Sequence, residues 1–594
     1  MNNTITVKKK TNAQMIVLSF IICHLSFSVA LTSCSDWDDH YESDTALLDT
    51  QHSTLWENIS GSSSLSQFAS LIKKAGYDAV LNTSQTYTVW APVDGTYDYQ
   101  TLSGLPVSRL VREFVDNHIA RNNYPASGDV SQQVYTLNEK LMTFGSADKV
   151  FGGSGSNYVV QGIEVAQPNI GGYNGVMHLI TGIIPFRANI YESLNTNEHA
   201  IDSVANYYHS FDESKLNEEK STQGPMLNGE ITYLDSVFDE TNDLLARYNA
   251  YINREDSNYT MIVPTNEAWR KAKEQISSYY RYIPSFEFME NTSASSQKKI
   301  TVTIRDIDSL TEAVVNQKIM NDLFYNNNLY DNKKLNLLQT GQTLNADSLY
   351  TTTRTKVYTE DAAMLFEGAQ REERSNGTVW LTDSLRMRSW TTWNPEIIMQ
   401  AENSTLLSSV SNVADNEANR VYVTPGTQNH AVSGHVSNNS FIELQPVSQS
   451  TNPGVVFYLP SVRSTTYSIY IVTVPANIVS TNRDAKPYRF TAAMGYADDK
   501  GKMQDRVNNW LADRYFVSDS SRVDTIYLGD FTFPVAYYGT GNYYPILRIN
   551  SQVTSAQRNT YDRTMRIDCV ILRPKELDDY LKAHPDYVYD RGDY

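Results

Sequence analysis

Cysteine is scarce in this chain, with three residues in 594. Cys23 lies in an apolar N-terminal segment and Cys34 follows that segment directly, so the body of the chain holds Cys569 alone. One leftover cysteine cannot form a disulfide within the chain, and we therefore expect apolar cores to supply the stability. Cys569 stands in the alternating run RIDCVIL, which predicts a buried, small apolar side chain rather than a nucleophile.

Positive charge is also in short supply. The 49 lysine and arginine residues face 67 aspartate and glutamate residues, which gives a formal net charge of −18. No basic stripe runs through the sequence. Because a chain of this charge is repelled by phosphate backbones, we predict no nucleic acid among its partners.

The motifs of common catalytic centres are missing as well. The sequence has no HExxH, no GxSxG, no Walker loop and no GxGxxG after an apolar strand. Its ten histidines are scattered, and none is spaced with cysteines as in a zinc site. We therefore predict that the protein is not an enzyme.

Length and composition indicate several globular domains. A chain of 594 residues is too long for one core, so about three domains are expected. Hydrophobic residues make up 41% and charged residues 20%, which is typical of globular domains and not of a protein with several membrane spans. The 40 tyrosines favour half-exposed β surfaces and binding faces, because each combines an apolar ring with a polar tip.

The N-terminus resembles a targeting signal. Lys8, Lys9 and Lys10 precede the apolar run Met15–Leu31, and Thr-Ser separates this run from Cys34. LTSC resembles the lipobox of bacterial lipoproteins. This resemblance implies that residues 1–33 are a cleaved signal peptide and that Cys34 becomes the lipidated first residue. A plain secretory signal and an uncleaved anchor are the alternatives.

An acidic tether follows over residues 34–51. It begins with SDWDDHYES, which resembles the acidic surface-export signal of Bacteroidetes lipoproteins. The resemblance implies a lipid anchor in the outer membrane with the protein facing the extracellular side. The plainer interpretation is a solvated, flexible tether.

Residues 52–190 carry two motifs and a helix in a recognisable order. TYTVWAPVDGTYD is followed by the amphipathic helix VSRLVREFVDNHI and then by YNGVMHLITGIIP. This order resembles the fasciclin (FAS1) domain, an α+β fold, although Gly95-Thr96-Tyr97 depart from the first motif of that family. We expect His178 in the second motif to be a packed core residue rather than a ligand.

The same pattern returns over residues 195–395. YTMIVPTNEAW, LTEAVVNQKIMNDLF and SNGTVWLTDSLRM take the three places, and Trp380 stands where the first copy has His178. The motifs predict a strand that ends at proline, a helix started by Asp94 or Asn266, and an Asn-Gly turn into a buried strand. Residues 286–300 are expected to form a polar inserted loop.

Residues 396–575 predict an all-β sandwich, followed by a short helix and a polar tail over 576–594. Strand-like runs are separated by turn-forming residues at sandwich spacing. The end strands, MQAEN and RIDCVIL, resemble those of jelly-roll, galactose-binding-like carbohydrate-binding modules, whose Gly-Asp-Trp signature is missing here. The resemblance implies a structural calcium near Glu402 and Asp568.

Aromatic clusters are the candidate ligand-binding residues of the sandwich. Aromatic rings stack on the apolar faces of sugars, and neighbouring amides bind the hydroxyl groups. The alternative for each ring is an ordinary edge or core position. The candidates are Trp510, Tyr537, Tyr538, Asn542, Tyr543 and Tyr544.

These observations predict a cell-surface lipoprotein with two fasciclin-like domains and a sandwich. It would bind a glycan or glycoconjugate, as an accessory of a SusC/SusD-type outer-membrane nutrient uptake system. The alternative is an adhesion or structural protein that binds other proteins or matrix through its fasciclin domains.

Overall fold

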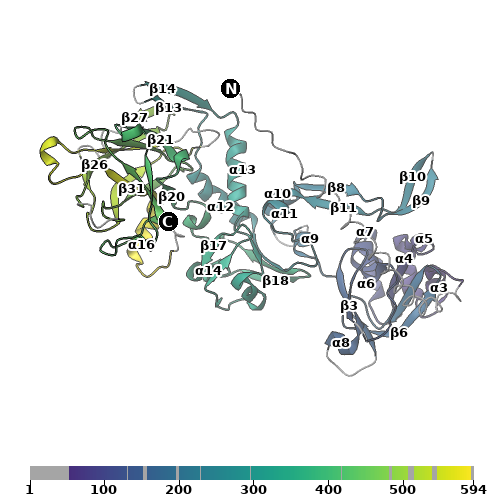
Figure 1. The fold of residues 1–594 in the computed structure, drawn as a ribbon. Coiled ribbons are helices and arrows are strands. Elements are labelled where there is room, and N and C mark those ends of the chain that lie inside the picture. The colour runs from purple at the N-terminus through teal and green to yellow at the C-terminus, as the bar shows by residue number, and fades with distance from the viewer. Residues whose placement is uncertain are drawn as a thin grey trace, which may run out of the picture. The chain divides into compact units, whose positions relative to one another are not determined.

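The structure is a computed structural model in which the described residues form two compact units (Figure 1). The first unit runs to Arg187 and includes Glu213–Thr241, and the second comprises Ala188–Asp212 and the chain from Asn242. The predictions for the signal peptide, Cys34 and the tether fall outside the described residues. These are 52–129, 131–151, 157–194, 200–227, 229–293, 296–416, 418–479, 485–505, 514–537 and 545–589.

A seven-stranded sheet forms the first unit, in the order β2-β1-β7-β6-β5-β4-β3. β1 and β7 pair in parallel and the other neighbours pair antiparallel. Every residue of β1 is buried, as a central strand between two covered faces requires. The strands are β1 Tyr87–Pro92, β2 Ile119–Arg121, β3 Ser131–Tyr135, β4 Leu141–Ser146, β5 Tyr158–Val160, β6 Ile163–Gly172 and β7 Gly175–Ile180.

Short helices pack their apolar sides against this sheet. In α4, Phe68, Leu71 and Ile72 are buried at helical spacing, and Gly76 ends the helix in a left-handed conformation. The helix predicted over 107–119 is present, and its turns change from α to π to 3₁₀ along its length. The helices are α3 Leu55–Gly61, α4 Ser66–Ala75, α5 Tyr77–Val80, α6 Tyr99–Gly104, α7 Val107–Leu110 and α8 Ala147–Phe151.

A nested hairpin arm, residues 212–242, was not predicted: its two inner strands pair with each other, and its two outer strands pair with each other (Figure 1). Most of it belongs to the first unit, although the chain on both sides belongs to the second. Thr222 links the arm to the first unit, because its hydroxyl donates to Gln85 (3.0 Å) and lies 2.9 Å from the Tyr87 hydroxyl. The strands are β8 Asp212–Leu216, β9 Thr222–Leu227, β10 Glu230–Asp235 and β11 Phe238–Asn242.

The second unit begins with a four-stranded sheet in the order β15-β12-β19-β18. Helices α12 and α13 pack side by side near it (Figure 1). The strands are β12 Tyr259–Pro264, β15 Phe324–Asn326, β18 Gln370–Arg374 and β19 Gly377–Thr382, with the small pair β16 Ser348–Tyr350 and β17 Lys356–Tyr358. The helices are α9 Ile190–Ser193, α10 Asp202–His209, α11 Asp243–Arg247, α12 Asn266–Tyr279, α13 Ile307–Met320, α14 Thr359–Leu365 and α15 Ser389–Thr392.

This sheet repeats the centre of the first unit's sheet. β12 and β19 pair in parallel with the same register as β1 and β7, so Tyr259 faces Gly377 as Tyr87 faces Gly175. An antiparallel neighbour flanks each parallel pair on both sides. We call β1, β2, β6 and β7 the first copy and β12, β15, β18 and β19 the second copy.

Glycine is required in both Asn-Gly pairs by close approach rather than by the turn that the sequence suggested. Gly172 pairs with Gly175, so the two turn residues lie between them and the glycine is already the first strand residue. The φ angles of Gly175 and Gly377 are 143° and 144°. A Cβ atom at either position would lie 1.9 Å from the carbonyl oxygen of the facing tyrosine.

The first motifs also differ from expectation. Helix α12 does begin at Asn266, with Thr265 as its N-cap, but no helix begins at Asp94. Both side chains instead cap an earlier helix. Asp94 accepts from the Gln67 N–H at the start of α4 (3.0 Å), and Asn266 accepts from the Ser203 N–H at the start of α10 (2.8 Å).

Two six-stranded sheets complete the second unit, and side chains from both form one core that includes Ile469 and Phe490. One sheet has the order β22-β23-β31-β25-β29 with β20 on β31, and the other has β21-β24-β30-β26-β27 with β28 on β26. The strands are β20 Ile397–Gln400, β21 Leu407–Ser411, β22 Asn419–Tyr422, β23 Ser440–Leu444, β24 Gly454–Tyr458, β25 Thr466–Thr473, β26 Arg489–Ala497, β27 Met503–Asp505, β28 Phe516–Val517, β29 Asp524–Thr532, β30 Ile546–Ser551 and β31 Met565–Pro574.

Residues 286–300 do not form the expected polar loop. They lie in a hairpin of β13 Ser285–Ser293 and β14 Ser296–Thr303, and β13 lies beside β26 and β27 (Figure 1). The Glu287 N–H donates to the Gly501 carbonyl (2.6 Å), and the Lys502 ammonium bonds the Glu287 carboxylate (2.9 Å). The polar composition hid this hairpin because backbone pairing needs no apolar pattern.

The predicted C-terminal helix is present as α16 Lys575–Ala583. Cys569 is fully buried, as expected. In the described part of the chain, no helix combines the length and the apolar character needed to cross a membrane.

Candidate functional site

Tyr537 is the one described member of the predicted aromatic cluster, and the structure does not expose it. Its side chain is 7% exposed and packs against Phe286, with ring centroids 5.4 Å apart. Its hydroxyl accepts a hydrogen bond from the Ala497 N–H. Tyr537 is therefore a core tyrosine, which corrects its prediction as a ligand contact. Trp510, Tyr538, Asn542, Tyr543 and Tyr544 lie outside the described residues.

Glu402 and Asp568, predicted from the end strands, come together around two serines. β20 pairs with β31, which places Gln400 opposite Cys569 and brings the two carboxyl groups to one loop. Asp568 accepts from the Ser437 N–H (3.0 Å) and hydroxyl (2.6 Å). Glu402 accepts from the Ser440 hydroxyl (2.9 Å) through Oε1.

The charges and the free oxygen of this carboxyl pair are compatible with a bound cation. Burial, with the Glu402 charge as a smaller cause, raises the pKa of Asp568 to about 7. Oε2 of Glu402 is buried and accepts no hydrogen bond from the described residues. Oxygen ligands and an unpartnered carboxylate oxygen suit calcium. The described residues contain no group of three or more His, Cys, Asp or Glu side chains that could hold a metal ion, so calcium here would need hydroxyl or carbonyl ligands.

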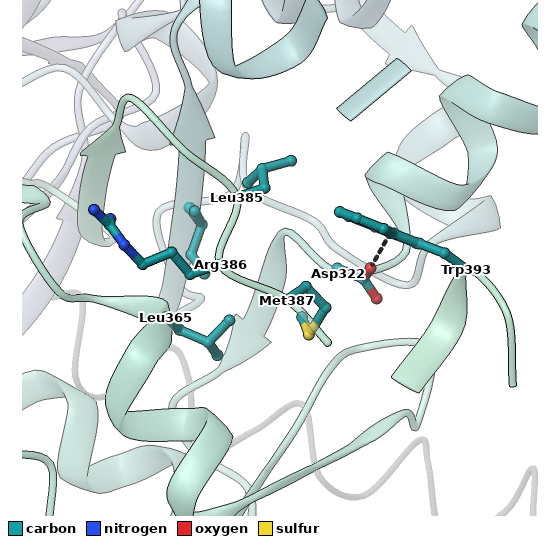
Figure 2. Close-up of a pocket in the computed structure, with 7 residues that line it drawn as sticks. Asp322, Leu365, Leu385, Arg386, Met387 and Trp393 are labelled. Carbon is teal, nitrogen blue, oxygen red and sulfur yellow. Dashed lines mark hydrogen bonds between the residues drawn. The ribbon is translucent and has the colours of Figure 1, made fainter. Parts of the chain in front are cut away.

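A second buried carboxyl was not predicted. Asp322 lies just after α13 and lines a cavity of about 10 Å³, together with Leu365, Met387 and Trp393 (Figure 2). Its Oδ2 accepts from the Thr392 hydroxyl (2.5 Å) and the Trp393 indole N–H (3.0 Å), while Oδ1 has no partner among the described residues.

Burial raises the pKa of Asp322 to about 7, although the hydrogen bonds from Thr392 and Trp393 and, to a smaller extent, the charge of Lys318 oppose this shift. Figure 2 shows the Arg386 side chain directed away from Asp322, with Met387 between them. The Arg386 guanidinium donates instead to the Glu367 carbonyl. The cavity has room for about one water molecule. Asp322 therefore anchors the chain at α15 to the end of α13, and the space beside it is too small for an organic ligand.

The two histidines of the first copy are packed residues, as predicted for His178. The His178 ring lies 5.8 Å from Trp90, accepts from the Asn169 N–H (3.3 Å) and donates to the Tyr124 carbonyl (3.0 Å). His118 likewise uses both ring nitrogens, toward Phe114 (2.7 Å) and Ile184 (2.9 Å). Burial lowers the pKa of each to about 4. Both rings are neutral at pH 7, and neither can reach a substrate.

The comparisons with known proteins bear on the first unit. Residues 63–185 match the model of the Fasciclin domain family. The matched range runs from the loop before α4 to the end of the second motif. The matched residues contain both histidines and neither of the two buried carboxyl sites.

Two solved structures share a fraction of the chain's length at low identity. The FAS1 domain pair from the insect cell adhesion molecule fasciclin I is 12% identical, with 55% of this chain and 98% of that chain covered and a TM-score of 0.19. A xylan-binding domain from CBM 22 is 13% identical, with 30% and 93% covered and a TM-score of 0.18. Scores this low support no conclusion about function. No curated protein sequence matches the chain.

Proposed function

We propose that this protein is a surface-anchored, non-catalytic binding protein whose β-sandwich takes up a glycan or glycoconjugate. In this proposal Cys34 carries the lipid anchor in the outer membrane, and the second copy is a divergent fasciclin domain. The protein serves as an accessory of a SusC/SusD-type nutrient importer and faces the extracellular side.

One observation carries the glycan proposal. The two end strands that resemble those of carbohydrate-binding modules, β20 and β31, are paired, and Glu402 and Asp568 meet at one loop as that resemblance implies. The pairing of β20 with β31 brings these two residues, 166 positions apart in sequence, to the same loop. In the proposal this site takes a structural calcium through Glu402, Asp568 and neighbouring oxygen atoms.

A second candidate function is adhesion through protein contacts, and the arm favours it. Several large apolar side chains on the arm are exposed, among them Met226 (66%), Leu227 (61%) and Phe238 (50%). Exposed apolar groups gathered on one element are typical of protein interaction sites. The fasciclin domain is compatible with this alternative.

A glycan array probed with the full chain from Ser35 onward separates the two candidates. Specific binding to a defined glycan supports the first proposal. If no glycan is bound, while the same chain is retained by proteins of the bacterial surface, the adhesion alternative replaces it. Thermal unfolding with and without a calcium chelator tests the metal. We expect the chelator to lower the unfolding temperature of the wild type and to have no effect on the Glu402→Gln variant.

A further inference from the structure

A cleft of about 300 Å³ opens at one end of the sandwich. Three loops line it, one after β23, one before β26 and one before β31. Its volume is at the lower end of the range for small-molecule sites. Three of its lining side chains are cationic, Lys486, Arg558 and Arg563, against the single carboxylate of Asp562. This local excess of positive charge stands out in a chain of net charge −18.

Arg563 is a buried cation without a carboxylate partner. Its side chain is 6% exposed. Nε and Nη2 donate to the Val553 carbonyl (3.1 and 2.9 Å), and Nη1 donates to the Gln449 carbonyl. Among the described residues no carboxylate pairs with it. Buried charges are normally paired, because desolvation of a lone ion is costly. Two of the five guanidinium N–H groups are left after these bonds.

Arg558 adds a second cation at the mouth of the cleft. Its side chain is exposed, and in the described part of the chain it makes one bond, from Nη1 to the Gln449 side chain (3.0 Å). Gln449 thus accepts from both arginines, from Arg558 through its side-chain oxygen and from Arg563 through its backbone carbonyl. An arginine fork with free N–H groups fits a carboxylate or sulfate in two-point geometry.

The one carboxylate in the cleft does not cancel these charges. Asp562 accepts from Arg566 (3.2 and 3.3 Å) and from the Thr564 N–H (3.0 Å), so both of its oxygens are engaged. Arg566 is also paired with buried Glu443 (2.8 Å). These three groups form an ionic network of their own, and Arg558 and Arg563 remain outside it.

Tyr561 gives the cleft an aromatic wall. The tyrosine is half-buried, and the Arg489 guanidinium lies 5.7 Å from its ring centroid. A ring beside amide and guanidinium donors combines a stacking surface for a sugar face with hydrogen-bond donors for its substituents.

We propose that this cleft binds a saccharide bearing carboxylate or sulfate groups, with Arg563 and Arg558 on the anionic group and Tyr561 against the sugar ring. This inference rests on the proposed glycan-binding function and names its site and ligand class. The anionic group would supply the missing counter-charge for buried Arg563.

Binding of four probes to the full chain from Ser35 onward tests this assignment: polygalacturonate, dextran sulfate, neutral dextran and inorganic phosphate. We expect an anionic polysaccharide to bind in low salt and neutral dextran not to bind. Because the protein is strongly acidic, binding of a polyanion requires a local cationic site. Binding of polygalacturonate alone identifies a carboxylate, and binding of dextran sulfate alone identifies a sulfate.

Two variants locate the site, one at exposed Arg558 and one at half-buried Lys486. Arg558→Gln and Lys486→Gln should each lower the affinity about tenfold, the size of one lost charge-assisted hydrogen bond. Lys500→Gln removes one exposed charge from the turn after β26 and should leave binding unchanged.

Three outcomes overturn the inference. The first is equal binding by the variants and the wild type. The second is binding of neutral glycans alone on the array, which leaves the proposed function standing. The third is phosphate binding as tight as that of the polysaccharides, which reduces the cleft to a simple anion site. If no glycan of any kind binds, the proposed function fails as well.

Discussion

The first and second copies use the same polar clamp around different cores. Asn174 accepts from the Leu55 N–H (2.8 Å) and donates to two carbonyls, those of Leu81 (2.9 Å) and Thr83 (2.8 Å). Asn376 repeats this pattern with Ile190 (2.9 Å), Ile252 (2.7 Å) and Arg254 (3.0 Å) as partners. In both copies the asparagine lies just before the second strand of the parallel pair. It bonds the first residue of a preceding helix (α3 or α9) and the loop that leads into the first strand of the pair (β1 or β12).

The cores behind the clamps differ. In the first copy Trp90 on β1 faces His178 on β7, whereas in the second copy Ile262 on β12 faces Trp380 on β19. The tryptophan of the facing pair therefore lies on the first strand in one copy and on the second strand in the other, while the backbone register is the same. Backbone hydrogen bonds and close approach fix residue type at a few positions, and core volume is free to be redistributed between neighbours.

The largest effect is expected from the shared glycines. Gly175→Ala and Gly377→Ala each force a Cβ against a tyrosine carbonyl, so either change should cost about 4 kcal/mol or more of the unfolding free energy of its own unit. Thermal and denaturant unfolding of the full chain measure this. Gly61→Ala, where a Cβ meets nothing within 4 Å, is the control. A Gly175→Ala protein as stable as the control would remove the close-approach argument.

The asparagine clamps come next. Asn174→Ala and Asn376→Ala leave one backbone N–H and two carbonyls without their partner, which should cost about 3 kcal/mol in each copy. Equilibrium denaturation compares the two losses. Losses that differ widely between the copies would show that the clamps are alike in geometry and unlike in energy.

Opposite pH responses are the third expectation. Between pH 4 and 6.5 the buried histidines of the first copy bind fewer protons when folded than when unfolded, so their contribution to stability falls as pH falls. Between pH 3.8 and 7 Asp322 binds more protons when folded, so its contribution falls as pH rises. Each group contributes about 1.4 kcal/mol per pH unit within its window.

Two variants isolate these contributions. His178→Gln should make the first unit less sensitive to acid, and Asp322→Asn should make the second unit less sensitive to a pH rise toward 7. Denaturant unfolding at several pH values gives the difference between each variant and the wild type. Differences that run in the same direction with pH would contradict the assignment.

The smallest effect concerns the exchanged indole. The double variant Trp90→Ile/His178→Trp gives the first copy the core pair of the second. It should be more stable than the sum of the two single changes predicts, by about 1 kcal/mol, because residues in contact couple. A double-mutant cycle measures this term, and strict additivity would mean that the two positions do not share their volume.

The repeated motifs were readable from the sequence because they depend on local rules. Proline after an apolar strand and an Asn-Gly pair before the next strand leave the same short pattern in both copies, although the roles of Asp94, Asn266 and the glycines were misassigned. The strand-like runs of the sandwich were readable for a similar reason, since they are bounded by turn residues, but their order in the two sheets was not predicted. Cys569 and His178 followed from the apolar residues around them.

Features built from distant residues were not readable. The arm pairs short, mostly polar strands with no apolar alternation. Asp322 lies in the run MNDLF, where an acidic residue amid apolar neighbours was the only signal of burial. The cleft depends on Lys486, Arg558 and Arg563 from two loops that only the sheet order brings together. The prediction for Tyr537 was wrong because the sequence around a tyrosine does not show whether its ring lies in the core or on a binding surface.

Because of the arm, no single cut in the chain separates the two units. The polypeptide passes from one unit to the other three times, near residues 187, 212 and 241. A protease that cuts after Arg187 would leave the arm still joining the two parts. A fragment that ends there would lose Thr222, the hydrogen-bonding partner of Tyr87 and Gln85. Truncation experiments on this protein should therefore keep the arm together with the first unit.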